Sequence, residues 1–207
     1  EISKKIFIKN KILTPKFQKL RTDIDKKKMI KFLKKKFKFP VVVKPINEGS
    51  SLGVYICNEK NIFKNLNKLK AYDEILVEEF IPGREIQAAI LGKKKLGAIE
   101  LKPKRKFYDY KAKYSSKAET KHIIPVNIRL KDFKNVMNIA LKAHKVLKCR
   151  GVTRSDFKFH NGKFYLLETN TQPGMTNLSL VPEIALHHGM NFFSLIDWII
   201  KDASKNR

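Results

Sequence analysis

Glu168-Thr169-Asn170-Thr171-Gln172-Pro173-Gly174-Met175-Thr176 is the stretch that decides how this chain folds, because it follows an apolar run, Phe164 to Leu167, that is typical of a strand. Successive side chains of a strand alternate between its two faces, so Glu168 and Asn170 point the same way. A carboxylate and a carboxamide oxygen on one face suit a hard cation such as Mg²⁺. Pro173-Gly174 then turns the chain away from the sheet. The stretch therefore predicts a metal-binding strand end.

A third oxygen ligand, Asp156, lies on the preceding strand, and the turn at Asn161-Gly162 decides whether it joins the other two. A two-residue type I′ turn in a regular hairpin would leave Asp156 and Glu168 on opposite faces. A three-residue loop with a left-handed glycine in a G1 bulge would shift the pairing and bring Asp156, Glu168 and Asn170 to one face. We predict the bulged turn because it unites the ligands. The alternative is an ordinary hairpin with solvated polar side chains.

The composition is that of a folded but strongly basic protein. The 207 residues suffice for one domain or two small ones, and 43% of them are hydrophobic. A net charge of +26 is typical of nucleic-acid or anionic-membrane partners. However, only 7 of the 45 basic residues are arginine, the residue that bidentate phosphate and guanine contacts prefer. We therefore expect weak, salt-dependent attraction to polyanions and no specific nucleic-acid partner.

Other site classes find little support in the sequence. Cys57 and Cys149 are too few for a disulfide framework or a cysteine zinc site, and the five histidines show no metal-binding spacing. The most apolar stretch, residues 192–200, is shorter than the roughly 20 residues that span a bilayer, and no signal peptide is visible. These features predict a cytoplasmic chain without a membrane partner.

Hydrophobic periodicity predicts an α+β chain of two lobes, residues 1–82 and residues 83–207. The expected helices cover 3–10, 23–37, 59–69, 131–147, 182–188 and 192–202, and the expected strands before the hairpin cover 40–45, 54–57, 74–80, 84–91 and 96–101. Residues 102–125 form a long segment without clear periodicity. Such segments in compact domains are usually functional loops or disordered.

Lys44 closes an apolar strand and precedes a Gly/Ser-rich loop, Asn47 to Gly53. An unpaired ammonium is costly to desolvate there, and a bound phosphate would offset that cost. Backbone N–H groups of the loop suit the same anion, although the loop matches neither the Walker A nor the GxGxxG pattern. The alternative is that Lys44 simply extends into solvent from the strand end.

Three further features are candidates for ligand contacts. Glu78-Glu79-Phe80-Ile81 ends a strand whose backbone could read an adenine edge, with Glu85 as an acceptor for ribose hydroxyls; otherwise these glutamates are solvated charges. The aromatic and lysine side chains of residues 107–114 suit base stacking, a lid over phosphates, or a plain surface. Arg154, two residues before Asp156, would face the metal and suit negative charge that develops on an oxygen.

Five segments in this order resemble the ATP-grasp superfamily, and within it the D-alanine–D-alanine ligases. They are VVVKPINEGSSLGV (41–54), ILVEEFIPGREI (75–86), FYDYKAKY (107–114), GVTRSDF (151–157) and FYLLETNTQPGMTNLSLVP (164–182). The third and the fifth are highly specific, whereas the Val-Lys-Pro strand alone is not. The resemblance covers nearly the whole chain and implies an ATP-grasp fold, in which two α+β lobes hold a nucleotide between them.

The resemblance also implies roles for individual residues. For ATP it implies a set that contacts phosphates, adenine and ribose: Lys44, Ser50, Ser51, Glu78, Phe80, Ile81, Glu85, Tyr108 and Lys113. Lys44 would bind the α- and β-phosphates, with Ser50 and Ser51 in a flap above them. Asp156, Glu168 and Asn170 would hold two Mg²⁺ ions, which Mn²⁺ can replace. Residues 1–82 would then be the small lobe with the flap and the adenine strand, and residues 83–207 the large lobe with the metal and D-alanine sites.

The implied reaction is phosphoryl transfer from ATP to the carboxylate of one D-alanine, followed by attack of a second D-alanine amine on the acyl phosphate. The implied catalytic residues are Lys113 at the transferred phosphate, Ser50, and Tyr114, whose presence resembles the ligases with an amine acceptor. Arg154 and the Gly174 N–H would stabilise the oxyanion. Ser179 and the Leu180 N–H would hold the second carboxylate. Peptidoglycan precursor synthesis is the implied pathway, in a cytoplasmic enzyme that is a homodimer at full length.

The family has an additional N-terminal domain that supplies a glutamate for the first D-alanine and a further phosphate-binding lysine. This chain opens on Glu1 without that domain, so we expect a truncated ligase with weak Mg-ATP binding and impaired peptide synthesis. Two rival functions stay open: another ATP-grasp carboxylate–amine ligase, and a basic nucleic-acid-binding module. A panel of acceptor amines distinguishes the first rival, and binding that survives loss of Asp156 and Glu168 distinguishes the second.

Overall fold

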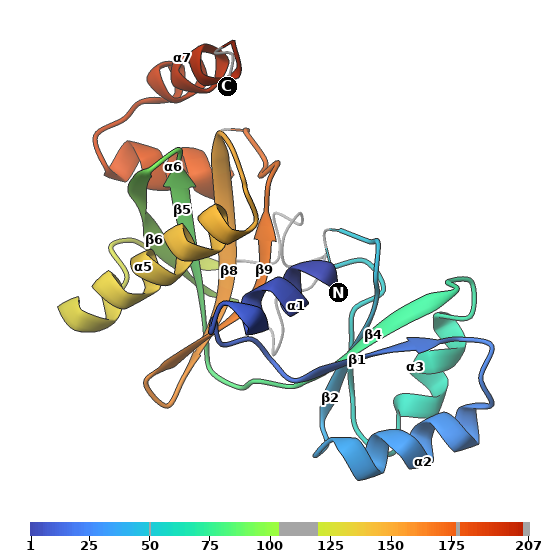
Figure 1. Ribbon diagram of the computed structural model, residues 1–207. Helices are drawn as coiled ribbons and strands as arrows, with labels where there is room; N and C mark the ends of the chain where they lie inside the picture. Colours follow the sequence, from blue (N-terminus) through green and yellow to red (C-terminus); the bar gives the residue numbers. More distant parts are fainter. Residues whose placement is uncertain (50, 104–119, 177–178, 205–207) are drawn as a thin grey trace. The chain divides into compact units, whose positions relative to one another are not determined.

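The computed structural model of the chain describes residues 1–49, 51–103, 120–176 and 179–204 (Figure 1). The chain divides into two compact units. Unit 1 comprises Glu1, Pro15–Ile81 and Pro103–Thr120, and unit 2 comprises Ile2–Thr14, Pro82–Lys102 and Lys121–Arg207. The main division, between Ile81 and Pro82, lies next to the boundary expected at residue 82. Residues 2–14, which belong to unit 2, and Pro103 and Thr120, which belong to unit 1, differ from the expectation.

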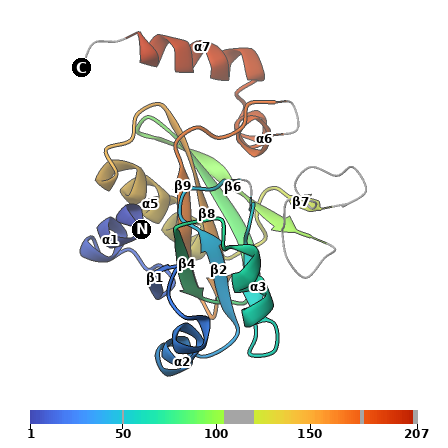
Figure 2. The same cartoon turned by 90° about the vertical axis from the view of Figure 1, so that its right-hand side faces the viewer.

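The packing of helix α1 (Ile2–Lys9) explains this difference. Phe7 and Ile12 are both part of the hydrophobic core of unit 2, and α1 lies beside α5 (Leu130–Val146) in both views (Figures 1 and 2). The Thr14 hydroxyl donates a hydrogen bond of 2.7 Å to the carbonyl oxygen of Leu166. These partners are far apart in sequence, so local periodicity could not reveal where the segment packs.

Unit 1 is an antiparallel sheet of four strands in the order β1-β4-β2-β3, packed against two helices. Its elements are β1 (Phe17–Arg21), α2 (Lys26–Lys36), β2 (Val41–Pro45), β3 (Tyr55–Cys57), α3 (Ile62–Lys68) and β4 (Glu74–Glu79). Helix α2 begins where Asp25 caps it, its carboxylate accepting from the Lys28 N–H at 2.9 Å. Its inward side chains, Met29 and Leu33, are one turn apart and reach the core between helices and sheet.

Strand β2 alternates between two faces, whereas a continuously buried strand was expected. Val41, Val43 and Pro45 are buried, and Val41 and Val43 belong to the core under α2 and α3. Val42 and Lys44 therefore lie on the other face of the sheet. The alternation places Lys44 away from the hydrophobic core of unit 1, on the face that also carries Glu78, the cross-strand partner of Val42.

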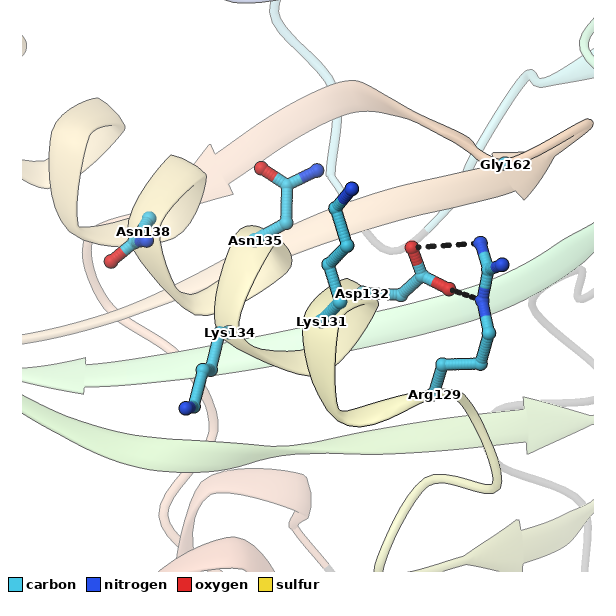
Figure 3. A pocket seen from close by; sticks show the side chains of 7 residues that line it. All are labelled: Arg129, Lys131, Asp132, Lys134, Asn135, Asn138 and Gly162. Atoms are coloured by element: carbon cyan, nitrogen blue, oxygen red, sulfur yellow. Dashed lines mark hydrogen bonds and ion pairs between the residues drawn. The ribbon is translucent and has the colours of Figure 1, made fainter.

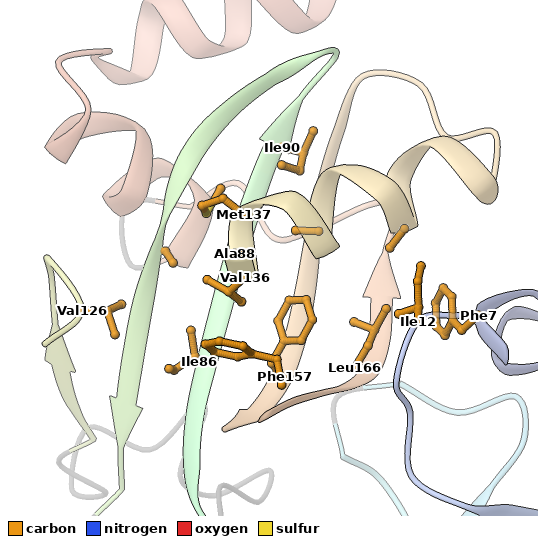
Figure 4. Packing of buried hydrophobic residues seen from close by; sticks show 14 residues of the cluster. Phe7, Ile12, Ile86, Ala88, Ile90, Val126, Val136, Met137, Phe157 and Leu166 are labelled. Atoms are coloured by element: carbon orange, nitrogen blue, oxygen red, sulfur yellow. The ribbon is translucent and has the colours of Figure 1, made fainter. Parts of the chain in front are cut away.

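Unit 2 is an antiparallel sheet of five strands in the order β7-β6-β5-β8-β9. Besides α1 and α5, its elements are β5 (Arg84–Leu91), β6 (Lys94–Lys102), β7 (Lys121–Ile123), β8 (Val152–His160), β9 (Lys163–Asn170), α6 (Leu180–His187) and α7 (Phe192–Ala203). Helix α5 covers one face, where Val136 and Met137 pack on Ile86, Phe157 and Leu166 (Figure 4). Helix α6 covers part of the other face, where Ile184 lies against Gly97 of β6.

The β8–β9 hairpin differs from the predicted turn. His160 pairs with Lys163, so the loop has two residues, Asn161 and Gly162, both with positive φ (48° and 72°) as a type I′ turn requires. The prediction of a three-residue loop with a G1 bulge at the turn was therefore wrong. The bulge lies further along the hairpin, where the register shifts beside Asp156 and leaves Leu167 as the extra residue.

The structure confirms the remaining expected helices and strands to within a few residues at their ends, and adds two strands that were not predicted. Strand β1 has no fully buried residue, and β7 is three residues long. Both lie at a sheet edge and contain no buried residue, so they leave no hydrophobic alternation for a pattern to show. In the described part of the chain, no helix is long and apolar enough to cross a membrane.

Candidate functional site

The predicted metal ligands lie on one face of unit 2, the face opposite α5. Asp156 of β8 pairs directly with Glu168 of β9, and Arg154 pairs with Asn170. Residues directly opposite each other in an antiparallel ladder share a face. The bulge at Leu167 produces this pairing, because an uninterrupted ladder would have placed Leu167 opposite Asp156. Asp156, Glu168 and Asn170 therefore share a face as predicted, but a bulge at Leu167 produces this arrangement, and not a bulge at the turn.

Arg154 and Asp156 form a bidentate ion pair. The Arg154 Nε lies 2.8 Å from Asp156 Oδ1, and its Nη2 lies 3.0 Å from Oδ2. Asp156 is buried, and the side chain of Arg154 is only 16% exposed. Charge-assisted, two-point bonds of this kind fix both side chains in place. The pair therefore holds a carboxylate and a guanidinium ready on the predicted metal face.

Glu168 and Asn170 complete the oxygen donors of this face. Within the described residues Glu168 has no ion pair, and the Nδ2 atom of Asn170 is buried without a hydrogen-bond partner. Two carboxylates directly opposite each other repel, and a bound cation would offset that repulsion. In the described part of the chain, no group of three or more His, Cys, Asp or Glu side chains is arranged so that it could hold a metal ion. The donor set of two carboxylates and one carboxamide fits Mg²⁺ or Mn²⁺, which accept few protein oxygens and keep water or substrate ligands.

Strand β5 adds two residues to the same face. Glu85, predicted as the ribose acceptor, pairs with Lys158, and the Lys158 ammonium lies 2.7 Å from its carboxylate. Gln87 pairs with Asp156 and is 4% exposed. Neither Lys158 nor Gln87 was predicted from the sequence. The alternation of side chains along a strand could have identified both residues, because it puts Gln87 on the same face as Glu85 and Lys158 on the same face as Asp156.

In unit 1, the predicted phosphate lysine contacts a predicted adenine-site residue. The Lys44 ammonium lies 3.0 Å from the Glu78 carboxylate, whose side chain is 4% exposed. Glu78 is buried, which excludes for it the alternative of a solvated charge, whereas Glu79 is exposed. The ion pair accounts for the low exposure of both side chains, because a buried charge needs a partner. It excludes the simple alternative in which Lys44 only extends into solvent.

The Gly/Ser-rich loop folds tightly between β2 and β3. Ser51 has a φ of 61°, and the Leu52 N–H donates to the Gly49 carbonyl oxygen at 2.9 Å. After β4, Phe80 is half-buried and Ile81 buried, so the predicted adenine strand ends with an apolar side chain on the inside. The structure places these residues in unit 1 together with Lys44.

The turn between β9 and α6 brings Gly174 and Ser179 together. A Cβ atom on Gly174 would lie 2.9 Å from the Ser179 Oγ atom, so a larger residue at position 174 would displace the Ser179 hydroxyl. Ser179 is the N-cap residue of α6, and its Oγ accepts from the Thr176 N–H at 3.0 Å. Leu180 is the first helical residue. The N-terminus of a helix offers free N–H groups and favours negative charge, which suits the carboxylate predicted here.

Four predicted site residues, Ser50, Tyr108, Lys113 and Tyr114, lie outside the described residues. Their roles remain the expectations stated above.

Two hollows of unit 2 lie away from the predicted residues. One, of about 430 Å³, runs along the start of α5 and is lined by Arg129, Lys131, Asp132, Lys134, Asn135, Asn138 and Gly162 (Figure 3). Its one carboxylate, Asp132, is bound to Arg129 at 2.8 Å. Another, of about 740 Å³, lies near Trp198 and the end of α5. Neither contains Asp156, Glu168 or Asn170.

Comparisons with known proteins agree with this geometry. Residues 7–201 match the family model of the D-Ala–D-Ala ligase C-terminus. The D-alanine–D-alanine ligase of Pelagibacter ubique is 67% identical over the whole chain, which covers 68% of that protein. The crystal structure of D-alanine–D-alanine ligase from Bacillus anthracis complexed with ATP is 29% identical, with a TM-score of 0.79 over 98% of this chain and 64% of that one. The crystal structure of the VanG D-Ala:D-Ser ligase from Enterococcus faecalis is 26% identical, with a TM-score of 0.83 over 96% and 59%.

The chain spans about 55–68% of the length of the curated relatives that it matches first. The likeness extends over almost all of the 207 residues, through both sheets. The fold is therefore the α+β ATP-grasp fold, and the chain belongs to the D-alanine–D-alanine ligase family, whose C-terminal portion it represents.

Proposed function

We propose that this chain is the nucleotide- and metal-binding portion of an ATP-dependent ligase that joins two D-alanines through a D-alanyl phosphate. The observation that carries the proposal is the shared face of Asp156, Glu168, Asn170 and Arg154 in unit 2. A structural hairpin would not need two carboxylates opposite each other, an arrangement that costs stability. The family membership supports the same assignment.

Residues of unit 1 would bind the nucleotide. Lys44, held by Glu78 at 3.0 Å, is fixed in direction and would donate to the α- and β-phosphates. Ser51 and the neighbouring loop, with Ser50 as expected from the resemblance, would close over the phosphates. Phe80 and Ile81 would frame the adenine. We propose that residues of both units contact the nucleotide.

Residues of unit 2 would hold the metal and the reacting groups. Asp156, Glu168 and Asn170 would bind two Mg²⁺ ions, which would stabilise the negative charge of the phosphate oxygens. Each carboxylate oxygen of Asp156 has a second lone pair, so Asp156 would bind a cation while it keeps its bonds from Arg154. The guanidinium group, held on the same face by this pair, would stabilise the oxygen on which negative charge develops. The ion pair therefore prepares Arg154 for its proposed catalytic role.

The acceptor end of the site would be the turn before α6. Ser179 accepts from Thr176 N–H, and its hydroxyl proton would be donated to the carboxylate of the second D-alanine. The Leu180 N–H and the positive end of α6 would add to this site. The Gly174 N–H would stabilise the oxyanion, while Lys113, Tyr108 and Tyr114 keep the roles that the family resemblance implies.

A second acceptor is supported by one comparison. The similar structure of a D-Ala:D-Ser ligase makes D-serine the alternative to D-alanine in the second position. A panel of D-amino acid acceptors, assayed on the chain joined to the part of its relatives that it does not cover, tests the choice. We propose a cytoplasmic reaction for peptidoglycan precursor synthesis, because ATP is a cytoplasmic substrate, and a homodimer at full length.

The test is isothermal titration of Mg-ATP into the 207-residue chain and into an Asp156→Ala/Glu168→Ala variant. We expect magnesium-dependent binding that the variant loses by at least about tenfold, because both carboxylates of the metal face are removed. The matched control is Glu59→Ala/Asp197→Ala, which changes net charge equally at side chains that are 60% and 58% exposed. The control should bind like the unaltered chain.

Equal binding by the chain and the Asp156→Ala/Glu168→Ala variant would overturn the metal assignment. If the chain does not bind at all, the titration is repeated after joining it to the part of the Pelagibacter ubique relative that it does not cover. Binding that then depends on Asp156 and Glu168 would support the site and show that the upstream part is required. Continued absence of binding would overturn the proposed function.

A further inference from the structure

Gln87 is a buried polar side chain on the metal face that the proposed reaction does not use. It lies in the middle of β5, where it pairs with Asp156 of β8 and with Ile99 of β6. Direct cross-strand neighbours have Cβ atoms about 4.5–5.5 Å apart. The side chain is 4% exposed. Gln87 is therefore next to the proposed metal ligand Asp156 and shielded from bulk water.

The carboxamide oxygen of Gln87 lacks a partner. In the part of the chain that the structure describes, its Oε1 atom is buried and accepts no hydrogen bond. A buried acceptor that is left unsatisfied is costly, and buried polar groups in folded proteins nearly always have partners. Such an atom at a strand centre points to a donor that arrives with a ligand.

The neighbouring cations of this face already contact carboxylates. The Arg154 guanidinium is bound to both oxygens of Asp156, and the Lys158 ammonium is bound to Glu85 at 2.7 Å. The next residue of β5 on the face is Ala89, which carries no polar side-chain atom. The donor for Gln87 is thus best sought in the group that Asp156 and Glu168 would bind. Magnesium keeps several of its water ligands in proteins, and those waters are strong donors.

We propose that Gln87 is a positioning residue of the metal centre: its carboxamide oxygen accepts a hydrogen bond from a water bound to the metal ion held by Asp156 and Glu168. The inference rests on the proposed function and deepens its metal site. The neutral carboxamide suits the place, because it orients a metal-bound water without adding a third negative charge beside two carboxylates. Outer-shell acceptors of this kind set the affinity of metal sites.

The test compares two substitutions at position 87. Gln87→Leu keeps the approximate volume and removes the acceptor, whereas Gln87→Glu keeps an acceptor oxygen. Binding of Mn²⁺ is measured by the electron paramagnetic resonance of free Mn²⁺ with the non-hydrolysable analogue AMP-PNP present. We expect Gln87→Leu to weaken Mn²⁺ binding about tenfold and Gln87→Glu to preserve it. Without metal, Gln87→Leu should unfold at the same urea concentration as the unaltered chain or a higher one, because an unsatisfied acceptor is removed.

The matched control is Ile86→Val, the preceding residue of β5, which is fully buried on the α5 face. It should lower the urea midpoint and leave Mn²⁺ binding unchanged, as a change in packing alone would. Asp156→Ala is titrated in parallel. Mn²⁺ binding that depends on Asp156 but is unaffected by Gln87→Leu would overturn the role of Gln87 alone. If no Asp156-dependent binding is seen even after the chain is joined to the part of the Pelagibacter ubique relative that it does not cover, both this role and the proposed metal site are overturned.

Discussion

At the scale of single residues, burial decides the charge of His144. The side chain lies on α5 with 4% exposure, and its Nδ1 atom is 2.9 Å from the Thr153 hydroxyl of β8. Desolvation lowers the pKa of His144 below its ordinary value of 6.5, partly offset by the carboxylate of Asp202. The imidazole is therefore held neutral as part of the packing between α5 and the sheet.

This lowered pKa predicts a loss of stability in mild acid. Above pH 6.5 the imidazole is neutral in both states, so it adds no pH dependence. As the pH falls below 6.5, the unfolded chain binds a proton that the folded chain does not, and the free energy of unfolding decreases until the folded pKa is passed. Urea unfolding at pH 7.5 and pH 5.5 measures the change. His144→Gln should remove part of this decrease, and an undiminished decrease in the variant would contradict the assignment.

A second residue-scale prediction concerns Gly83, which follows the boundary between the units. Its φ is 116°, and an added Cβ would overlap the carbonyl oxygen of Phe159. Gly83→Ala should therefore lower the free energy of unfolding by at least about 2 kcal/mol. The control is Gly162→Ala, where φ is 72° but the surrounding space is open, so only backbone strain of about 1 kcal/mol applies. Equal costs for the two variants would contradict the close approach at Gly83.

At the scale of elements, the β8–β9 hairpin determines which residues meet. The type I′ turn alone would place Leu167 opposite Asp156. The bulge shifts the register by one residue and places Glu168 there instead. A sheet has a side-chain period of two, so one extra residue exchanges the faces of everything beyond it. Leu167 is that residue.

Single deletions on β9 test this account. Removal of Leu167 leaves Glu168 opposite Asp156 in a regular ladder, so the proposed metal ligands stay on one face. Removal of Thr169 instead moves Asn170 opposite Ser155, on the face that α5 covers. We expect Mn²⁺ binding, measured by electron paramagnetic resonance, to persist without Leu167 and to fall at least about tenfold without Thr169. The reverse order of effects would show that the bulge does not set the register.

At the scale of the whole molecule, the net charge of +26 is the dominant property. Many of the lysines lie on helix surfaces; α2, for example, carries Lys34, Lys35 and Lys36 in its last turn. Like charges of this number favour contact with any polyanion, with an affinity that falls as salt displaces the released counterions.

We therefore expect weak binding to single-stranded DNA at low ionic strength that disappears near physiological salt. The Asp156→Ala/Glu168→Ala variant should bind DNA at least as well as the unaltered chain, because two negative charges are removed. Fluorescence anisotropy of a labelled oligonucleotide at several salt concentrations measures this. Tight binding that persists at high salt would support the rival function of a nucleic-acid-binding module.

The sequence by itself determined the fold class, most helices and strands, and the choice of Asp156, Glu168 and Asn170 as the proposed metal ligands. Strand alternation puts Glu168 and Asn170 on one face, and helical spacing predicts α2 and α5, because these patterns depend on residues close together in the chain. The family resemblance rested on the same local motifs. Edge strands β1 and β7 were missed because they bury too little to leave a pattern.

Only the tertiary structure decided which of these residues meet. The register that joins Asp156 to Glu168 depends on a bulge whose position no local pattern specifies. The ion pair of Lys44 with Glu78, the burial of Gln87 beside Asp156, and the packing of α1 in unit 2 all involve residues from separate elements. Pairing between distant strands is chosen by the total burial and hydrogen bonding of a whole sheet, so it is a property of the folded chain and not of any single segment.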